Sequence, residues 1–226
     1  MSTDLHSVLF DLDGTLVDTA PDFIVAVNAL RHSHQLPPLP DASIAEQVSN
    51  GSIALTRHAF DIDESSREFD SLRAQLLANY LDCIGQHARL YHGLDMLLQA
   101  LENSGRQWGV VTNKPLTYAQ PLMDKLSLSD RCGTLICPDH VSEPKPHPEA
   151  LFMAADALGS AVEKTVYIGD HHRDISAGQA AGMKTVAAAY GYIEASDNVE
   201  HWRADRIVQQ PGDLHSTLEQ LYACKI

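Results

Sequence analysis

Short apolar runs that alternate with helical stretches constrain the fold of this 226-residue chain more than any other feature of its sequence. Runs suited to buried strands occupy residues 108–112, 134–137, 165–168, 184–188 and 206–208. Helical periodicity fills residues 94–104, 115–126, 148–158, 174–181 and 213–222. Strands that alternate with helices form a parallel sheet with helices on both faces. The sequence therefore predicts an α/β fold with a doubly wound, Rossmann-like parallel sheet.

The first strand of this sheet is expected at residues 8–10, which are apolar and are followed by Asp11 and Asp13. Gly14 then permits a sharp turn. Open α/β sheets bind ligands beyond the carboxyl ends of their strands. Two carboxylates so close repel each other unless a cation or a shared proton compensates. A hard divalent cation such as Mg²⁺, which prefers oxygen ligands, is the expected compensator.

Residues 20–90 contain helical stretches and no strand signal. The stretches are 21–35, with Thr19 as the expected N-cap, then 41–49, 51–60 and 65–86, and prolines interrupt them at 36–40. A block of helices that follows the first strand is an insertion and not part of the sheet. We therefore expect two domains, an α/β core of residues 1–16 and 91–226 and an inserted helical domain of residues 17–90.

Polar residues also end or precede later elements of the predicted core. Thr112 ends one strand, Lys145 lies in a proline-rich loop before a helix, and Asp170 follows another strand, with Asp174 four residues on. The carboxyl ends of parallel strands lie along one edge of the sheet. That edge is predicted to gather Asp11, Asp13, Thr112, Lys145, Asp170 and Asp174.

Such a set of side chains suits phosphoryl transfer. Asp170 with Asp11 could hold Mg²⁺, and Lys145 with Thr112 could hold phosphoryl oxygens. Either Asp11 or Asp13 could attack phosphorus, because carboxylates serve as phosphoryl nucleophiles. The other would protonate the leaving oxygen and later activate water.

Four motifs resemble those of the haloacid dehalogenase superfamily phosphatases, and the resemblance covers essentially the whole chain. They are Asp11-Leu12-Asp13-Gly14-Thr15, Thr112 in Val-Val-Thr-Asn-Lys, Lys145 in Lys-Pro-His-Pro, and Gly169-Asp170 with Asp174. The resemblance implies Asp11 as a nucleophile that forms an aspartyl-phosphate, and Asp13 as general acid and base. It also implies Mg²⁺ held by Asp11, Asp170 and the backbone carbonyl of Asp13, with Asp174 supporting the metal indirectly.

The same resemblance gives the phosphate to Thr112, Asn113 and Lys145. The helical insertion corresponds to the family's cap, which closes over the site, excludes water and selects the substrate. Residues 48–51, followed by Leu55 and Arg57, are similar to the cap of phosphoglycolate phosphatases. The candidate substrate contacts in the cap are Asn50, Gly51 and Arg57, whose planar guanidinium suits a carboxylate.

Several stretches look closer to the N-acetylmuramic acid 6-phosphate phosphatases. They are residues 109–115, 136–141 and 190–193, together with Asp197, Asn198 and Trp202, and with Arg173 directly before Asp174. The resemblance implies a small phosphorylated acid or sugar as substrate. N-acetylmuramic acid 6-phosphate, an intermediate of peptidoglycan recycling, is the first expectation, and 2-phosphoglycolate is the alternative.

Other functions fit parts of the pattern. A phosphomutase of the same fold would yield a rearranged ester and no free phosphate. A C–P bond hydrolase would need an amine nucleophile in the cap, and residues 20–90 contain no lysine. A non-catalytic binding module would be expected to lack the nucleophile, whereas Asp11 and Asp13 are both present.

Composition limits the partners. A net charge of −14 disfavours nucleic acid, because phosphate backbones bind basic surfaces. No apolar run approaches ~18 residues, and no secretory signal precedes the first strand, so we expect no membrane segment and a cytoplasmic location. The four cysteines match no zinc pattern. A metal site at the adjacent pair His171-His172 is disfavoured, because neighbouring residues rarely converge on one ion.

Overall fold

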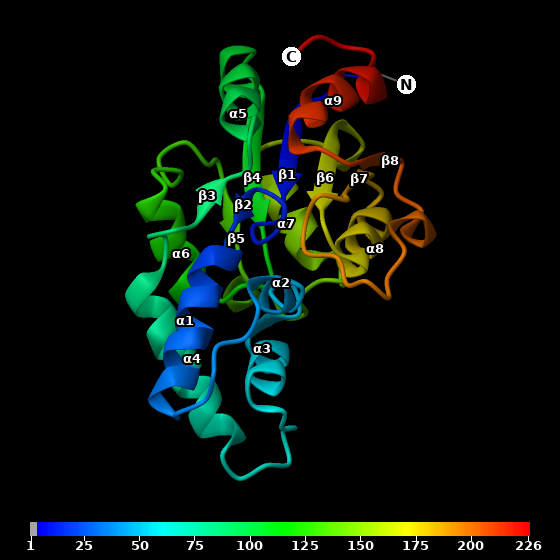
Figure 1. Cartoon of the computed structure of the whole chain (residues 1–226). Coiled ribbons are helices and arrows are strands. Elements are labelled where there is room, and N and C mark those ends of the chain that lie inside the picture. The colour runs from blue at the N-terminus through cyan, green and yellow to red at the C-terminus, as the bar shows by residue number, and fades with distance from the viewer. Residues whose placement is uncertain (1–3) are drawn as a thin grey trace.

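The computed structural model describes residues 4–226, and it confirms the predicted fold class. The main strands are β1 (Ser7–Phe10), β4 (Gln107–Val111), β5 (Leu135–Ile136), β6 (Thr165–Gly169), β7 (Lys184–Ala188) and β8 (Arg206–Val208). They form a six-stranded sheet in the order β5-β4-β1-β6-β7-β8, with every pair parallel (Figure 1). The first strand of the chain therefore lies between β4 and β6, and its carboxyl end lies in the middle of the sheet edge.

All four residues of β1 are buried. Val8 and Phe10 pack into one apolar cluster and Leu9 packs into another, because successive side chains of a strand point to opposite faces. A parallel strand that is covered on both faces has to be apolar throughout. This requirement explains why the short run at residues 8–10 identified the strand.

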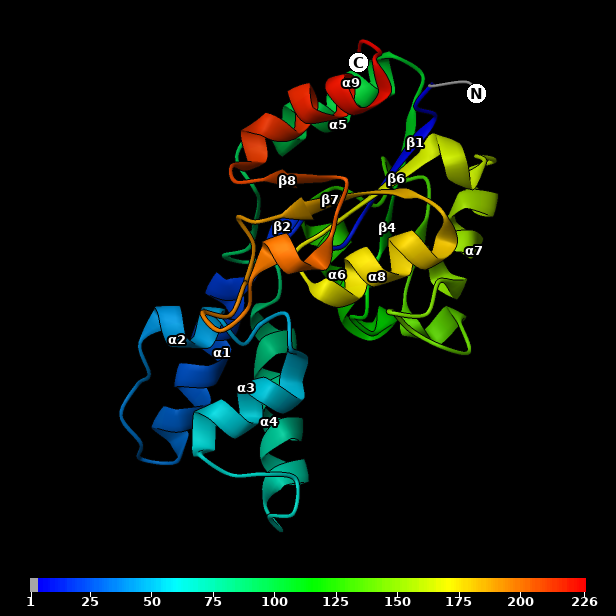
Figure 2. The ribbon, with the colours of Figure 1, turned by 90° about the vertical axis from the view of Figure 1, so that its right-hand side faces the viewer.

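Helices cover the two faces of the sheet (Figure 2). The cluster of Val8 and Phe10 includes side chains of α5 (Leu94–Asn103), α6 (Leu116–Lys125) and α9 (Leu214–Tyr222). The cluster of Leu9 includes those of α7 (Glu149–Ala157) and α8 (His172–Ala181). Short 3₁₀ turns occupy Pro138–His140, Val162–Lys164, Val199–Trp202 and Pro211–Asp213. Among residues 4–226, no helix combines the length and apolar character needed to cross a bilayer.

A block of helices lies below the sheet edge at the carboxyl ends of the strands (Figures 1 and 2). It contains α1 (Ala20–Ser33), α2 (Asp41–Ala45), α3 (Gly51–Phe60) and α4 (Phe69–Cys83). The rings of Phe23 in α1 and Tyr80 in α4 stack with centroids 3.9 Å apart. The helix expected at 65–86 is shorter than predicted, because turns occupy the residues before Phe69 and the backbone leaves the helical region at Ile84.

A small antiparallel ladder joins the helical block to the sheet. It pairs β2 (Val17–Asp18) with β3 (Arg89–Leu90). The expectation of no strand within residues 20–90 is wrong at β3, since two-residue strands carry no periodic signal. The buried carboxylate of Asp22 strengthens the connection by accepting three backbone N–H groups, those of Gly85 (2.7 Å), His87 (2.8 Å) and Ala88 (3.2 Å).

Candidate active site

The end of β1 places Asp11 beside Lys145, which comes from the loop before α7. The Lys145 Nζ lies 2.9 Å from Asp11 Oδ1 and 2.7 Å from Asp174 Oδ1, and the side chain is 1% exposed. Burial alone would lower the pKa of Lys145, but the carboxylates of Asp11 and Asp174 raise it above its ordinary value. Lys145 is therefore a buried positive charge held next to Asp11.

Three buried carboxylates meet at the same edge. Oxygens of Asp11, Asp170 and Asp174 lie within 4.8 Å of one another. Burial, followed by the charges of Asp11 and Asp174, raises the pKa of Asp170 to about 7. Lys145 offsets only part of this negative charge. Because hard divalent cations prefer carboxylate oxygens, this acidic cluster could bind a metal ion.

Asp170 is held tightly against the loop that follows β1. The Thr15 hydroxyl donates to Asp170 Oδ1 at 3.0 Å, and the backbone N–H of Tyr192 donates to Oδ2 at 2.9 Å. Gly14 faces this carboxylate with a φ of +82°, and a Cβ there would lie 2.1 Å from Asp170 Oδ2. Only glycine combines this backbone conformation with such a close approach.

The side chain of Asp13 has different partners. Its Oδ1 accepts hydrogen bonds from Lys114 Nζ at 2.8 Å and from the Thr19 hydroxyl at 2.6 Å. Thr19, predicted as an N-cap, makes no side-chain capping bond to α1. Burial would lower the pKa of Lys114, but Asp13 and the Tyr80 hydroxyl raise it above its ordinary value. Asp13 is thus paired with a cation outside the acidic cluster.

Thr112 and Asn113 follow β4. The Thr112 hydroxyl accepts the backbone N–H of Lys114 at 3.1 Å. The Asn113 amide donates to the carbonyl of Lys145 at 2.9 Å, and its oxygen accepts the N–H of Lys145 at 3.1 Å. The Asn113 side chain, expected at the phosphate, is therefore engaged with the loop that carries Lys145.

His171, the residue between Asp170 and α8, has a structural role at the start of that helix. Burial, with a smaller effect of Arg173, lowers the pKa of His171 to about 4. The ring is therefore neutral at neutral pH, and its Nδ1 accepts the backbone N–H of Arg173 at 3.2 Å. His172 is exposed, and the metal-ligand group found among the described residues includes neither histidine.

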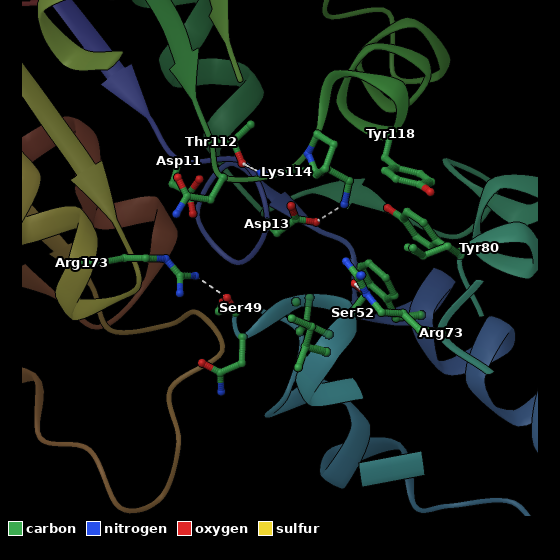
Figure 3. Close-up of a pocket in the computed structure, with 18 residues that line it drawn as sticks. Asp11, Asp13, Ser49, Ser52, Arg73, Tyr80, Thr112, Lys114, Tyr118 and Arg173 are labelled. Carbon is green, nitrogen blue, oxygen red and sulfur yellow. Dashed lines mark hydrogen bonds and ion pairs between the residues drawn. The ribbon is translucent and has the colours of Figure 1, made fainter. Parts of the chain in front are cut away.

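A cavity of about 320 Å³ separates the sheet edge from the helical block (Figure 3). Its lining includes Asp11, Asp13, Thr112 and Asn113 from one side and Ser49, Asn50 and Gly51 from the other. Arg57 lies elsewhere, since its guanidinium forms an ion pair with Glu64 on the exposed surface. The structure therefore brings together the predicted site residues with the exception of Arg57.

Sequence reasoning missed three residues of α4 that line the cavity, Arg73, Leu77 and Tyr80. Lys114 and Arg173 also line it, although the sequence gave their side chains no role. A signal for the α4 residues exists, because Arg73, Leu77 and Tyr80 are spaced at i, i+4 and i+7 and so share one helical face. That spacing identifies a site only once α4 is known to face the sheet edge.

The segment before α3 fastens the helical block to the core. The Ser49 hydroxyl donates to Asp170 Oδ2 at 2.9 Å, and the Arg173 guanidinium donates to the Ser49 carbonyl. The Asn50 amide donates to the carboxylate of Glu194. The block is thus closed over the cavity.

A doubly wound sheet, an acidic strand edge with a buried lysine, and a helical block closed over the site define a capped α/β hydrolase. Residues 8–188 match the family model of haloacid dehalogenase-like hydrolases. The chain belongs to this family, which confirms the resemblance seen in the motifs.

Relatives and solved structures match nearly the full chain. An N-acetylmuramic acid 6-phosphate phosphatase of Pseudomonas aeruginosa is 44% identical over 216 residues, 96% of each chain. A phosphoglycolate phosphatase of Xanthomonas campestris pv. campestris is 44% identical over 210 residues, 92% of this chain and 94% of that protein. The crystal structure of a predicted phosphoglycolate phosphatase from Haemophilus somnus has a TM-score of 0.82 at 26% identity, covering 96% of this chain and 99% of that one.

Proposed function

We propose that the protein is a Mg²⁺-dependent phosphomonoesterase that works through an aspartyl-phosphate on Asp11. The observation that carries this proposal is the position of the Asp11 carboxylate, which forms an ion pair with Lys145 and belongs to the acidic cluster. A phosphoryl group bound at Asp11 would lie next to the lysine and next to a cation. Charge developing on its oxygens is stabilised most effectively by such fixed positive groups.

The reaction has two displacements. In the first, an Asp11 carboxylate oxygen attacks phosphorus, the bond from phosphorus to the ester oxygen breaks, and Asp13 donates a proton to the leaving oxygen. In the second, Asp13 removes a proton from water as the water oxygen attacks the aspartyl-phosphate, which restores Asp11 and releases inorganic phosphate. Thr112 and Lys145 bind phosphoryl oxygens throughout, and Asn113 holds the Lys145 loop in place.

The residues present fit Mg²⁺, because every donor in the group is an oxygen. Asp11, Asp170 and the backbone carbonyl of Asp13 would hold the ion, with Asp174 beside them. When bound, Mg²⁺ supplies a positive charge that offsets the charge of the phosphoryl oxygens.

The helical block, residues 17–90, acts in this proposal as the cap domain, and residues 1–16 and 91–226 form the core. Asn50 and Gly51 line the cavity from the cap side and would contact the substrate there. The closed block covers the reacting phosphorus, which limits access of bulk water.

The proposed substrate is N-acetylmuramic acid 6-phosphate, and its hydrolysis would be a step of peptidoglycan recycling. The relative that carries this name, 44% identical to the chain, supports it. The alternative substrate, 2-phosphoglycolate, is supported by relatives named for that activity. The cavity has a volume of about 320 Å³, and sites for small-molecule ligands begin at about 300 Å³. It can therefore hold a substrate larger than a two-carbon acid.

The test is a phosphate-release assay with Mg²⁺ on both candidate substrates. We expect release from the muramic acid ester and a loss of roughly 1,000-fold or more in Asp11→Asn, because the nucleophile is removed. The matched control is Asp156→Asn, an exposed position on α7, which should retain full activity. Undiminished turnover by Asp11→Asn would contradict the mechanism, and a rearranged ester without free phosphate would identify a mutase.

A further inference from the structure

Arg73 brings a positive charge to the cap side of the cavity (Figure 3). Its Nε donates to the Ser52 hydroxyl at 2.8 Å, and within residues 4–226 no carboxylate forms an ion pair with it. Arg57, by contrast, is bound to Glu64. A guanidinium that contacts only a neutral hydroxyl keeps its charge and most of its donors available for an anion.

The other cations of the site differ in how far they are neutralised. Lys114 is paired with Asp13, and Lys145 contacts two carboxylates. Arg173 donates to the Ser49 carbonyl, and no carboxylate among the described residues lies within ion-pair distance of it. The cavity therefore presents two guanidinium groups that form no direct ion pair among the described residues, which favours a ligand with more than one anionic group.

Two buried groups in the cavity wall also have a proton to donate and, within the described part of the chain, no acceptor for it. The Tyr80 side chain is 1% exposed, and no acceptor for its hydroxyl proton occurs in the described chain. The Nε of Arg173 is likewise buried and unpaired in residues 4–226. Buried donors are nearly always satisfied, and leaving one unpaired is costly. A ligand that carries several oxygen acceptors would satisfy both.

The position of Arg73 fixes which end of such a ligand it meets. Asp11 and Arg73 lie on opposite sides of the cavity in Figure 3, and the stacked Phe23 and Tyr80 line the wall on the Arg73 side. We infer, on the basis of the proposed phosphatase function, that Arg73 binds a carboxylate of the substrate while the phosphate lies at Asp11. The cap thereby selects phosphate esters of sugar acids over those of neutral sugars.

The test compares two esters that differ in a single 3-O-lactyl group, which carries the carboxylate: N-acetylmuramic acid 6-phosphate and N-acetylglucosamine 6-phosphate. Arg73→Gln should lower kcat/KM for the acidic ester by roughly 10- to 100-fold, mainly through KM, because a charge-assisted contact is lost. For the neutral ester the change should stay below about 3-fold, since that contact never forms. Arg73→Lys should recover part of the preference, because it keeps the charge without the planar fork.

Arg67→Gln, an exposed position in the same block, is the matched control and should leave the preference for the acidic ester unchanged. An equal loss on both esters in Arg73→Gln would overturn the inference, because it would indicate a role confined to holding Ser52. A loss of preference in Arg57→Gln with none in Arg73→Gln would also overturn it.

A binding measurement separates this inference from the proposed function. Calorimetry with the Asp11→Asn protein and N-acetylmuramic acid 6-phosphate should show binding that Arg73→Gln weakens by roughly 10-fold or more. Such a result together with no phosphate release by the wild type would contradict the phosphatase proposal and retain the carboxylate site. Equal affinity of both esters for the Asp11→Asn protein would overturn the carboxylate site alone.

Discussion

Ionisation of the Asp170 carboxylate is unfavourable when no cation is bound. Burial, then the neighbouring charges of Asp11 and Asp174, raises its pKa from 3.8 to about 7. Because the folded-state pKa is the higher one, the folded state binds the proton more tightly than the unfolded chain. The stability contributed by this group is fully present below the unfolded pKa and is lost as the pH rises through about 7.

The raised pKa of Asp170 leads to a prediction about metal binding. Protons and Mg²⁺ compete for the Asp170 carboxylate, so Mg²⁺ affinity should increase by up to about tenfold per pH unit below the pKa and level off above it. The Mg²⁺-induced rise in melting temperature should therefore be larger at pH 8 than at pH 6. Isothermal titration calorimetry measures the Mg²⁺ affinity of the wild type and of Asp170→Asn at each pH. The variant should bind Mg²⁺ weakly and show a flatter pH dependence. Equal wild-type affinities at pH 6 and pH 8 would contradict the prediction.

At the scale of elements, the connection between β2, β3 and α1 depends on Asp22. Its buried carboxylate accepts N–H groups from three residues of the segment that returns from α4. Asp22→Ala would leave these donors without their acceptor, and hydrogen bonds to charged groups contribute about 1.5–3 kcal/mol. We expect a loss of about 2–4 kcal/mol in the free energy of unfolding, measured by urea denaturation. Asp82→Ala, at an exposed position of α4, should change it by less than about 0.5 kcal/mol.

The elements of the sheet were predictable from sequence because each strand is buried on both faces. Val8, Leu9 and Phe10 are fully buried, so the whole run is apolar and is bounded by polar residues. The ladder of β2 with β3 was not predictable, because two-residue strands have no period and Asp22 gives no sign of its distant partners. The observed helix ends also differ from the predicted ones, because local turns such as those before Phe69 compete with the helix.

Some residues of the site could also be predicted from the sequence, and others could not. Asp11, Thr112 and Asp170 could be placed together because parallel topology aligns strand ends, whatever the loops do. Arg73 could not, because its role depends on how α4 packs across the cavity. Arg57 was favoured by its resemblance to the cap of phosphoglycolate phosphatases and by its residue type, and its partner Glu64, seven residues away, is visible only in the folded chain.

At the scale of the whole molecule, two of the connections between the helical block and the core differ in kind. One is the covalent connection through β2, β3 and Asp22. The other is the segment before α3, where Ser49 and Asn50 contact the core without a covalent link. Opening of the cavity by rotation about the first connection breaks the contacts of the second, together with the ring contacts of Phe23 and Tyr80 with Lys114 and Tyr118.

This asymmetry predicts the effect of weakening the second connection. Glu194→Ala removes the acceptor of the Asn50 amide, an exposed contact, and leaves the Ser49 contacts and the acidic cluster intact. An exposed hydrogen bond to a charged group contributes about 0.5–1 kcal/mol, so the open population should rise roughly 2- to 5-fold. Hydrogen exchange of residues 47–55 should accelerate by that factor, while exchange in β1 stays unchanged. Glu200→Ala, an exposed change in the same part of the core, is the control. Unaltered exchange at residues 47–55 in Glu194→Ala would show that the Asn50 contact does not hold the block closed.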